Sequence, residues 1–405
     1  MAKIATRIAQ LTGEGALAVY TRAKELEKQG RSIIHLELGE PDFHPAAPVG
    51  DALRAAVAEG RDRYVSTRGI PPLREGIADY LKRTRKLDVR AEQVLVAPGC
   101  KMALALAMMA LIEPGDEVLY PDPSFPIYPS FTRGLGAKAV SYALREKNRF
   151  QPDVAEIAAK ITPKTRMLIF NSPNNPTGTV FSDGTLLQIA ELARKHDLWV
   201  IADEIYARIL FNGEYKSIWA LPGMADRTVI IDGFSKSFAM TGWRLGYAVA
   251  QTRVIDALDM LVLNTFTCTA EFTQVAGIEA LLDITSAVPA MVHEYRKRRD
   301  LFVAKLNKIP FEGIGNNAQK TLADADLLLK QLGTEVMPQA RETLAAAQTA
   351  LNSANSALQP DSSLSQNTGE AMRELARTAA SFRTLAEYLE RHPEALIRGK
   401  PEDKK

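Results

Sequence analysis

The sequence predicts an α/β fold in which a mostly parallel β-sheet is covered by helices, followed by an all-helical C-terminal segment. Short apolar runs rich in β-branched residues recur up to about residue 310, and amphipathic stretches such as residues 184–196 separate several of them. Runs of this kind are typical of strands buried on both faces of a parallel sheet. From residue 316 onward no strand pattern occurs. We therefore expect the chain to change architecture near residues 313–317.

The predicted elements follow in chain order. Residues 2–30 predict a helical arm that ends at Gly30. Strands are predicted at residues 93–97, 117–120, 167–170, 199–202 and 228–231. Two long helices are predicted after the last strand, at residues 256–284 and 289–309.

The C-terminal tail has a heptad pattern. Residues 316–359 contain no aromatic residue, and apolar residues recur at intervals of seven on each side of Pro338, at Leu322, Leu329, Val336, Leu344, Leu351 and Leu358. A second amphipathic helix is predicted at residues 370–391. This spacing is typical of a coiled coil, and a helical hairpin packed on the main body would produce it equally well.

Composition excludes several classes of protein. The 405 residues carry a formal net charge of +2, with 46% hydrophobic and 24% charged residues, which excludes a mostly disordered chain and predicts no nucleic-acid partner. The two cysteines, Cys100 and Cys268, form no metal-binding or disulfide spacing, so no metal site is expected. The longest apolar run, residues 102–112, is too short to span a membrane. We expect a cytoplasmic protein with no membrane partner.

Three predicted strands end in polar residues. The strand ending at residue 170 precedes an Asn-rich turn, the next ends at Asp203 with Tyr206 nearby, and the third leads to Lys236. Ligands in open α/β sheets bind beyond the carboxyl ends of strands, so an amide, a carboxylate, a phenol and an amine are predicted to share one cleft. The turn at Gly99 opens a helix, and its backbone N–H groups would suit a phosphate. Taken singly, Asp203 also reads as a helix cap and Lys236 as a surface lysine.

Several of these segments together resemble the class I aminotransferases, fold-type-I enzymes that use pyridoxal 5′-phosphate. The resemblance covers about residues 5–309 and rests on residues 38–42, 64–74, 171–178, 202–206 and 235–244. It implies an N-terminal arm with part of a small domain (residues 1–45), a cofactor-binding large domain with its following helices (46–310), and an unrelated helical tail (316–405). The tail stands where the family has the rest of an α/β small domain.

The resemblance also implies roles for individual residues. Lys236 would form an aldimine with the cofactor and then move a proton as general acid and base, and Asp203 would pair with the pyridine nitrogen. The cofactor-binding set is Tyr64, Gly99, Cys100, Lys101, Phe125, Asn175, Asp203, Tyr206, Ser235, Lys236 and Arg244. Within it, Tyr206 and Asn175 would contact the ring's phenolic oxygen, and Phe125 would stack on the ring. The phosphate would be held by Arg244 and the backbone around residues 99–101.

The resemblance further implies the assembly and the substrate side of the site. Tyr64 would reach the phosphate of a neighbouring subunit, which predicts a homodimer. Gly39, Phe125 and Asn175 are the predicted substrate-binding residues, and Lys236, Asp203 and Tyr206 the catalytic ones. The substrates would be an α-amino acid and a 2-oxo acid, with no ranking among aspartate, alanine and aromatic amino acids.

Two positions depart from the family pattern. Gly233 stands where the family often has a hydroxyl residue. After Phe311 nothing resembles the family, so the arginine that clamps the substrate α-carboxylate has no predicted counterpart. Residues 318–403 instead resemble the helical C-terminal region of paraquat-inducible protein B-type MCE proteins, which suggests a chimera. An unusual helical small domain is the alternative.

Three functional hypotheses follow from the sequence. The leading one is transamination through Lys236, impaired by the missing arginine. A lyase that depends on the same cofactor is the second. The third is a cofactor-binding but inactive chimera, or an assembly protein that works through its helical tail.

Overall fold

The computed structural model describes residues 3–282, 287–308 and 349. Its strands are β1 (Val94–Ala97), β2 (Glu117–Asp122), β3 (Lys138–Ala143), β4 (Thr165–Asn171), β5 (Trp199–Asp203), β6 (Thr228–Gly233) and β7 (Gly246–Val249). Its helices are α1 (Gly15–Lys28), α2 (Ala47–Ala58), α3 (Pro71–Arg85), α4 (Cys100–Leu111), α5 (Ile127–Gly134), α6 (Val154–Lys160), α7 (Asp183–Lys195), α8 (Thr252–Leu263), α9 (Glu271–Leu282) and α10 (Ala287–Leu306).

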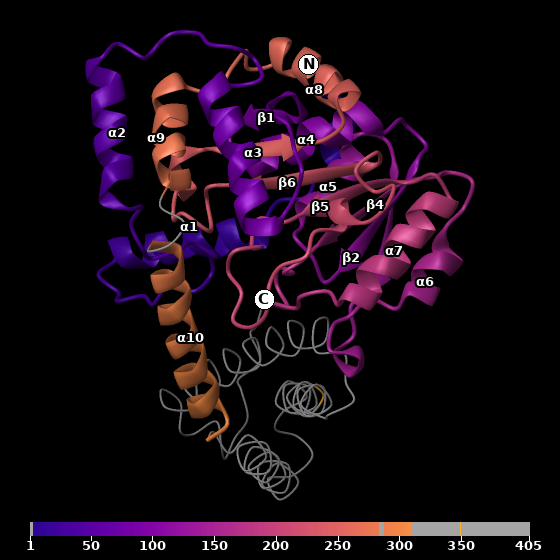
Figure 1. The fold of residues 1–405 in the computed structure, drawn as a ribbon. Helices are drawn as coiled ribbons and strands as arrows, with labels where there is room; N and C mark the ends of the chain where they lie inside the picture. Colours follow the sequence, from indigo (N-terminus) through magenta and orange to yellow (C-terminus); the bar gives the residue numbers. More distant parts are fainter. Residues whose placement is uncertain (1–2, 283–286, 309–348, 350–405) are drawn as a thin grey trace, which may run out of the picture. The chain divides into compact units, whose positions relative to one another are not determined.

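The seven strands form one mixed sheet in the order β1-β7-β6-β5-β4-β2-β3 (Figure 1). The pairs β6–β5, β5–β4, β4–β2 and β2–β3 are parallel, whereas β7 runs antiparallel to both β1 and β6. The predicted α/β fold with a mostly parallel sheet is confirmed. All five predicted strands are present.

Helices cover both faces of the sheet. One face packs against α4, α5 and α8. The other packs against α3 and α9 over β1, β6 and β7, and against α6 and α7 over β2, β4 and β5. Neighbouring residues of one strand enter opposite cores, as Ile230 and Ile231 of β6 do, because side chains alternate across a strand. Both side chains are fully buried, which explains the continuous apolar runs of the sequence.

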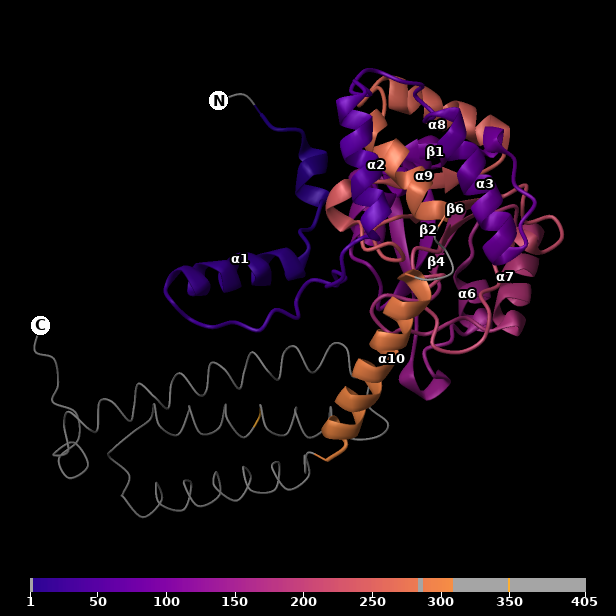
Figure 2. The ribbon, with the colours of Figure 1, turned by 60° about the vertical axis from the view of Figure 1, so that its left-hand side comes forward.

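The helices after the sheet differ from the prediction. One helix was expected over residues 256–284, but the structure has α8 and α9 with a break between them. Thr267, in that break, has a left-handed φ of 66°, which is incompatible with a continuous helix. The break lets α9 turn back and pack beside α2, and the two helices lie side by side in Figures 1 and 2. The prediction of a single helix was therefore wrong.

The N-terminal arm is also divided. It comprises a 3₁₀ helix, Thr6–Gln10, and α1, after which Gly30 has a left-handed φ of 84° as the end of a helix requires. Only Ala23 of α1 is buried.

The site described below lies within the first compact unit of the chain, Met1–Arg298. The predicted tail helices, its heptads and its resemblance to MCE proteins fall outside the described residues and stay predictions, as do the domain limits. Among the residues that the structure describes, no single helix is both long and apolar enough to cross a membrane.

Candidate active site

The carboxylate of Asp203 lies buried at the carboxyl end of β5. Its Oδ2 accepts a hydrogen bond of 2.6 Å from the Tyr128 hydroxyl, and its Oδ1 accepts one of 3.3 Å from the backbone N–H of Ile205. Burial is the largest influence and raises the pKa of Asp203 to about 6, although both hydrogen bonds oppose the rise. The side chain is therefore mostly ionised at neutral pH and available to a cationic partner.

Lys236 follows β6, the strand next to β5 in the sheet. Its half-buried side chain donates a 2.6 Å hydrogen bond from Nζ to the carbonyl oxygen of Gly39. Burial lowers the pKa of Lys236 below its ordinary value, which makes the neutral amine more accessible. A neutral amine is the form that attacks a carbonyl or accepts a proton.

A candidate phosphate-binding site is formed where α4 begins. The first N–H groups of a helix have no acceptor within the helix, and those of α4 begin at Cys100 and Lys101. Gly99, just before them, has a left-handed φ of 86°, and a Cβ there would lie 2.2 Å from Nη2 of Arg244. Glycine thus lets the Arg244 guanidinium lie against the helix N-terminus, where both would bind an anion.

The structure explains the absence of a hydroxyl residue at position 233. A Cβ on Gly233 would lie 2.6 Å from Cα of Gly246 and 2.7 Å from Sγ of Cys100. The backbone of β7 therefore occupies the space that a side chain would need. Cys100 fills the remaining volume as a thiol, because burial and nearby carboxylates raise its pKa.

The remaining predicted residues on these strand ends are half-buried. Tyr206 lies near Asp203, and burial followed by the charge of Asp203 raises the pKa of its phenol. The backbone N–H of Asn175 donates to Oδ1 of Asn171 at 2.6 Å. Phe125 meets Tyr128 edge to face at 5.9 Å between ring centroids.

Other predicted residues contribute differently. The ammonium of Lys101 forms an ion pair with Glu14 and lies 5.3 Å from the centroid of the Phe125 ring. Ser235 is half-buried beside Lys236. Tyr64 is 86% exposed, and no hydrogen bond or ring contact within the described part of the chain joins it to the other predicted residues.

The sequence did not identify two residues that hold this site together. Tyr128 lies three residues after Phe125, and that helical spacing was the only available signal of its place below Asp203. Asn171 donates from Nδ2 to the carbonyl oxygen of Asp203 at 3.0 Å and so ties β4 to β5. The sequence places Asn171 at the start of the Asn-rich segment. Its hydrogen bond to Asp203 could not be predicted, because it depends on β4 and β5 being neighbours in the sheet.

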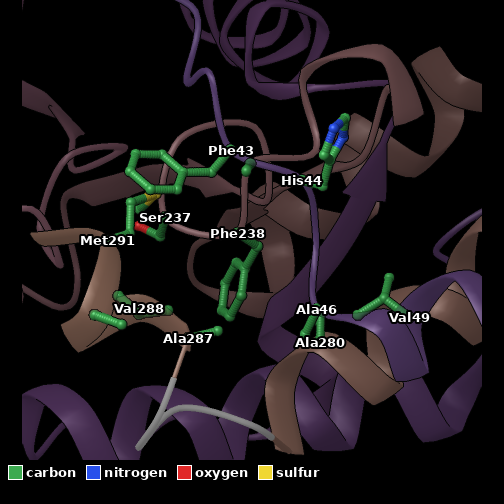
Figure 3. A pocket seen from close by; sticks show the side chains of 12 residues that line it. Phe43, His44, Ala46, Val49, Ser237, Phe238, Ala280, Ala287, Val288 and Met291 are labelled. Carbon is green, nitrogen blue, oxygen red and sulfur yellow. The ribbon is translucent and has the colours of Figure 1, made fainter. Parts of the chain in front are cut away.

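Two cavities border the segments that carry Lys236 and Gly39. Figure 3 shows one of about 270 Å³, lined among others by Phe43, Ser237, Phe238 and Met291. A more open one of about 590 Å³ extends from Glu40 to Thr241 and Trp243. None of the predicted cofactor residues lines either cavity. We therefore identify the site from its side chains.

The side chains present fit pyridoxal 5′-phosphate. The cofactor needs an anion for its ring nitrogen, an amine for its aldehyde and a cationic seat for its phosphate. Asp203, Lys236 and the Gly99–Arg244 pair supply these groups. The glycine contact is the most specific part of the fit, because it brings a guanidinium to a helix N-terminus.

Comparisons with known proteins agree with this geometry. The family model Aminotransferase class I and II matches residues 31–322, which extends beyond the predicted limit of residue 309. Arginine–pyruvate transaminase of Pseudomonas aeruginosa is 39% identical over 303 residues, which cover 74% of this chain and 77% of that relative. A probable aspartate/prephenate aminotransferase of Thermus aquaticus is 37% identical over 317 residues, 78% of this chain and 82% of its own length.

Solved structures give the same family. Aspartate aminotransferase from Thermus thermophilus with maleate matches with a TM-score of 0.73 at 36% identity, over 76% of this chain and 81% of that one. Alanine aminotransferase from Pyrococcus furiosus matches with a TM-score of 0.70 at 34% identity, over 76% of this chain and 80% of that one. The chain therefore belongs to the class I and II aminotransferases, and it is a pyridoxal 5′-phosphate-dependent aminotransferase of fold type I.

Proposed function

We propose that the chain transfers an amino group between an α-amino acid and a 2-oxo acid, with Lys236 as the catalytic amine. The observation that carries this proposal is that the buried Asp203 ends β5 and Lys236 follows β6, the neighbouring strand of the sheet. When bound, pyridoxal 5′-phosphate supplies a ring that accepts electrons and stabilises negative charge at the substrate Cα. Asp203 would keep the ring nitrogen protonated.

Lys236 would hold the cofactor through its aldehyde carbon and, once released, move a proton between the substrate Cα and C4′ of the cofactor. Its lowered pKa supports this role, because a base must be neutral to accept a proton. The hydrogen bond to Gly39 holds Nζ in place before reaction.

The other predicted residues would orient the cofactor. Tyr206 and Asn175 would contact its phenolic oxygen, and Phe125 would stack on the ring. Arg244 and the backbone of residues 99–101 would bind its phosphate, with Ser235 beside them. The close approach of Arg244 to Gly99 supports the phosphate assignment.

On the substrate side, Gly39, Phe125 and Asn175 would line the place of the amino acid. The predicted absence of the clamping arginine would weaken binding of the α-carboxylate, because a bidentate guanidinium fixes a carboxylate in both position and orientation. The proposed function is therefore transamination with a high KM for the amino acid.

The first test is a titration of the purified chain with pyridoxal 5′-phosphate, followed by borohydride reduction and peptide mass analysis. We expect the phosphopyridoxyl mass on the peptide that contains Lys236, and none in Lys236→Ala. Lys216→Ala is the matched control, because that exposed lysine pairs with Asp183 on the surface. Equal labelling of Lys236→Ala and the parent chain would overturn the assignment.

The second test separates transamination from the alternatives. The loaded chain is mixed with single amino acids, and the 2-oxo acid and ammonia are measured separately. A 2-oxo acid formed without ammonia, with saturation only at high amino-acid concentration, is expected. Release of ammonia would favour the lyase, and cofactor binding without either product would favour the inactive chimera.

We further propose a homodimer in which Tyr64 of one subunit binds the cofactor phosphate of the other. Its 86% exposure within one chain supports this, because a large aromatic side chain is costly to leave in water. Tyr64→Ala and Lys236→Ala variants should each have impaired sites, whereas hybrid dimers of the two should contain one intact site. If mixing the two variants does not restore the borohydride-fixed cofactor label on Lys236, the shared site is rejected.

A further inference from the structure

A charged network is buried behind the cofactor site. Arg85, the last residue of α3, has a side chain only 1% exposed. Its Nη1 donates to Oε2 of Glu204 at 2.6 Å, and its Nη2 donates to Oδ2 of Asp232. The two carboxylates are 0% and 3% exposed. The proposed transamination assigns no role to any of the three.

The network is attached to the strand ends that carry the site. Glu204 directly follows Asp203, and Asp232 lies in β6, four residues before Lys236. Asp232 also accepts hydrogen bonds from the Tyr247 hydroxyl at 2.8 Å and from the N–H of Gly233 at 2.6 Å. Glu204 accepts a further one from Ser217. Any change at Arg85 therefore acts on the two strands that position the cofactor groups.

Charge balance gives Arg85 its importance. Asp203, Glu204 and Asp232 are all buried, and the charge of Asp232 acts on the other two carboxyl groups. Burial alone would lower the pKa of Arg85, but Asp232 and Glu204 outweigh it and raise that pKa well above its ordinary value. The guanidinium thus remains a cation. The charge of Asp232, in contrast, adds to the rise in the pKa of Asp203.

Other ionisable groups also face these side chains. The ionisable groups that interact with Asp203 come from α4, α5 and the strand ends. They are Cys100, Tyr128, Tyr206, Asp232 and Lys236. Those around Arg85 are Tyr80, Glu204, Tyr215, Asp232 and Tyr247, with Arg208 acting on Tyr80. Of these, Arg85 is the cation hydrogen-bonded directly to both carboxylates that flank Asp203.

We propose that Arg85 is a positioning residue of the cofactor site: it neutralises Asp232 and Glu204, so that Asp203 stays ionised opposite the cofactor's ring nitrogen. The inference rests on the proposed role of Asp203. It assigns to a residue remote from the cofactor the control of the pH range over which the cofactor binds. Burying two carboxylates without their cation would otherwise favour protonation of the group that must stay charged.

The test is the affinity for pyridoxal 5′-phosphate of the apoprotein, measured from about pH 5 to about pH 9, alongside thermal unfolding. In the parent chain, affinity should fall as Asp203 protonates near pH 6. Arg85→Met should move that midpoint up by about one pH unit. The double variant Arg85→Met with Asp232→Asn should return it towards the parent value. Arg85→Lys, which keeps the charge, should shift it less than Arg85→Met.

Arg83→Met is the matched control. Arg83 lies in the same last turn of α3, but it pairs with Asp79 and donates to the carbonyl oxygen of Leu281. Arg83→Met should leave the pH midpoint of cofactor affinity unchanged. If Arg85→Met lowers thermal stability without moving the midpoint, or Asp232→Asn fails to reverse the shift, the proposal is overturned.

A variant that keeps Arg85 covers the case in which Arg85→Met does not fold. Asp232→Asn alone removes one charge near Asp203 and should move the midpoint down, and an unmoved midpoint contradicts the inference. If the parent chain itself fails to bind pyridoxal 5′-phosphate, the proposed function is what fails.

Discussion

The Tyr128 hydroxyl lies 2.6 Å from Oδ2 of Asp203, and both groups are buried beneath the predicted position of the cofactor ring. Burial raises the pKa of Tyr128, so the phenol keeps its proton and donates a hydrogen bond to the carboxylate. The bond favours the ionised form of Asp203 and opposes the effect of burial.

Removing this donor should weaken cofactor binding. In Tyr128→Phe the pKa of Asp203 should rise above about 6, and the dissociation constant for pyridoxal 5′-phosphate near neutral pH should increase about tenfold, as expected for a hydrogen bond to a charged group. Spectroscopic titration measures it. Tyr142→Phe is the control, because that buried phenol donates to the carbonyl oxygen of Ile169. An equal loss of affinity in both variants would contradict the prediction.

Asp203 should reduce the stability of the apoprotein. Its pKa rises from 3.8 to about 6 on folding, so its unfavourable contribution is absent below about pH 4, grows up to about pH 6 and is complete above it. Asp203→Asn should therefore raise the unfolding free energy at pH 8 by at most about 3 kcal/mol and leave it unchanged at about pH 4. Thermal unfolding of the apoproteins at the two pH values checks this. A destabilised variant at pH 8 would refute it.

The glycine at the helix N-terminus gives a third prediction. In Gly99→Ala the new Cβ would approach Nη2 of Arg244 to 2.2 Å, so the guanidinium must move away from α4. Affinity for pyridoxal 5′-phosphate should fall at least about tenfold, as loss of a charge-assisted hydrogen bond predicts, while affinity for pyridoxal, which has no phosphate, should change little.

A second glycine separates backbone strain from the contact with Arg244. Gly115 has a φ of 94°, similar to the 86° of Gly99, but a Cβ there would meet no atom within 4 Å. Gly115→Ala also places a side chain at a positive φ, at a conformational cost of about 1 kcal/mol or more, and should cause no loss of phosphate affinity. Equal losses of phosphate affinity in the two variants would show that strain alone is responsible.

The sequence predicted five strands, because continuous apolar runs such as that of β5 have few alternative structures. It missed β3 and β7 for different reasons. β3 is an edge strand with mostly half-buried side chains, and β7 has four residues and begins with glycine. Neither has an apolar run long enough to stand out from a loop.

The same limit applies to the site. Asp203 and Lys236 could be predicted because each follows a strand and sequence order places them at one edge. Arg85 could not be predicted as a buried residue. It lies with Lys82 and Arg83 in the last turn of α3, where basic side chains are usually exposed to solvent. Its burial depends on tertiary contacts with Glu204, Asp232 and the ring of Tyr215. Tyr128 likewise depends on which strand α5 covers.

The position of β7 constrains the order in which the chain can assemble. Among the described strands, β1 pairs with β7 alone, with Val94 opposite Val249, so this edge of the sheet cannot close until residue 249 has been synthesised. Gly99 follows β1 and Arg244 precedes β7. The phosphate seat is therefore completed by a late, long-range step of folding. A nascent chain in which β2 to β6 have already paired would still be unable to bind the cofactor's phosphate.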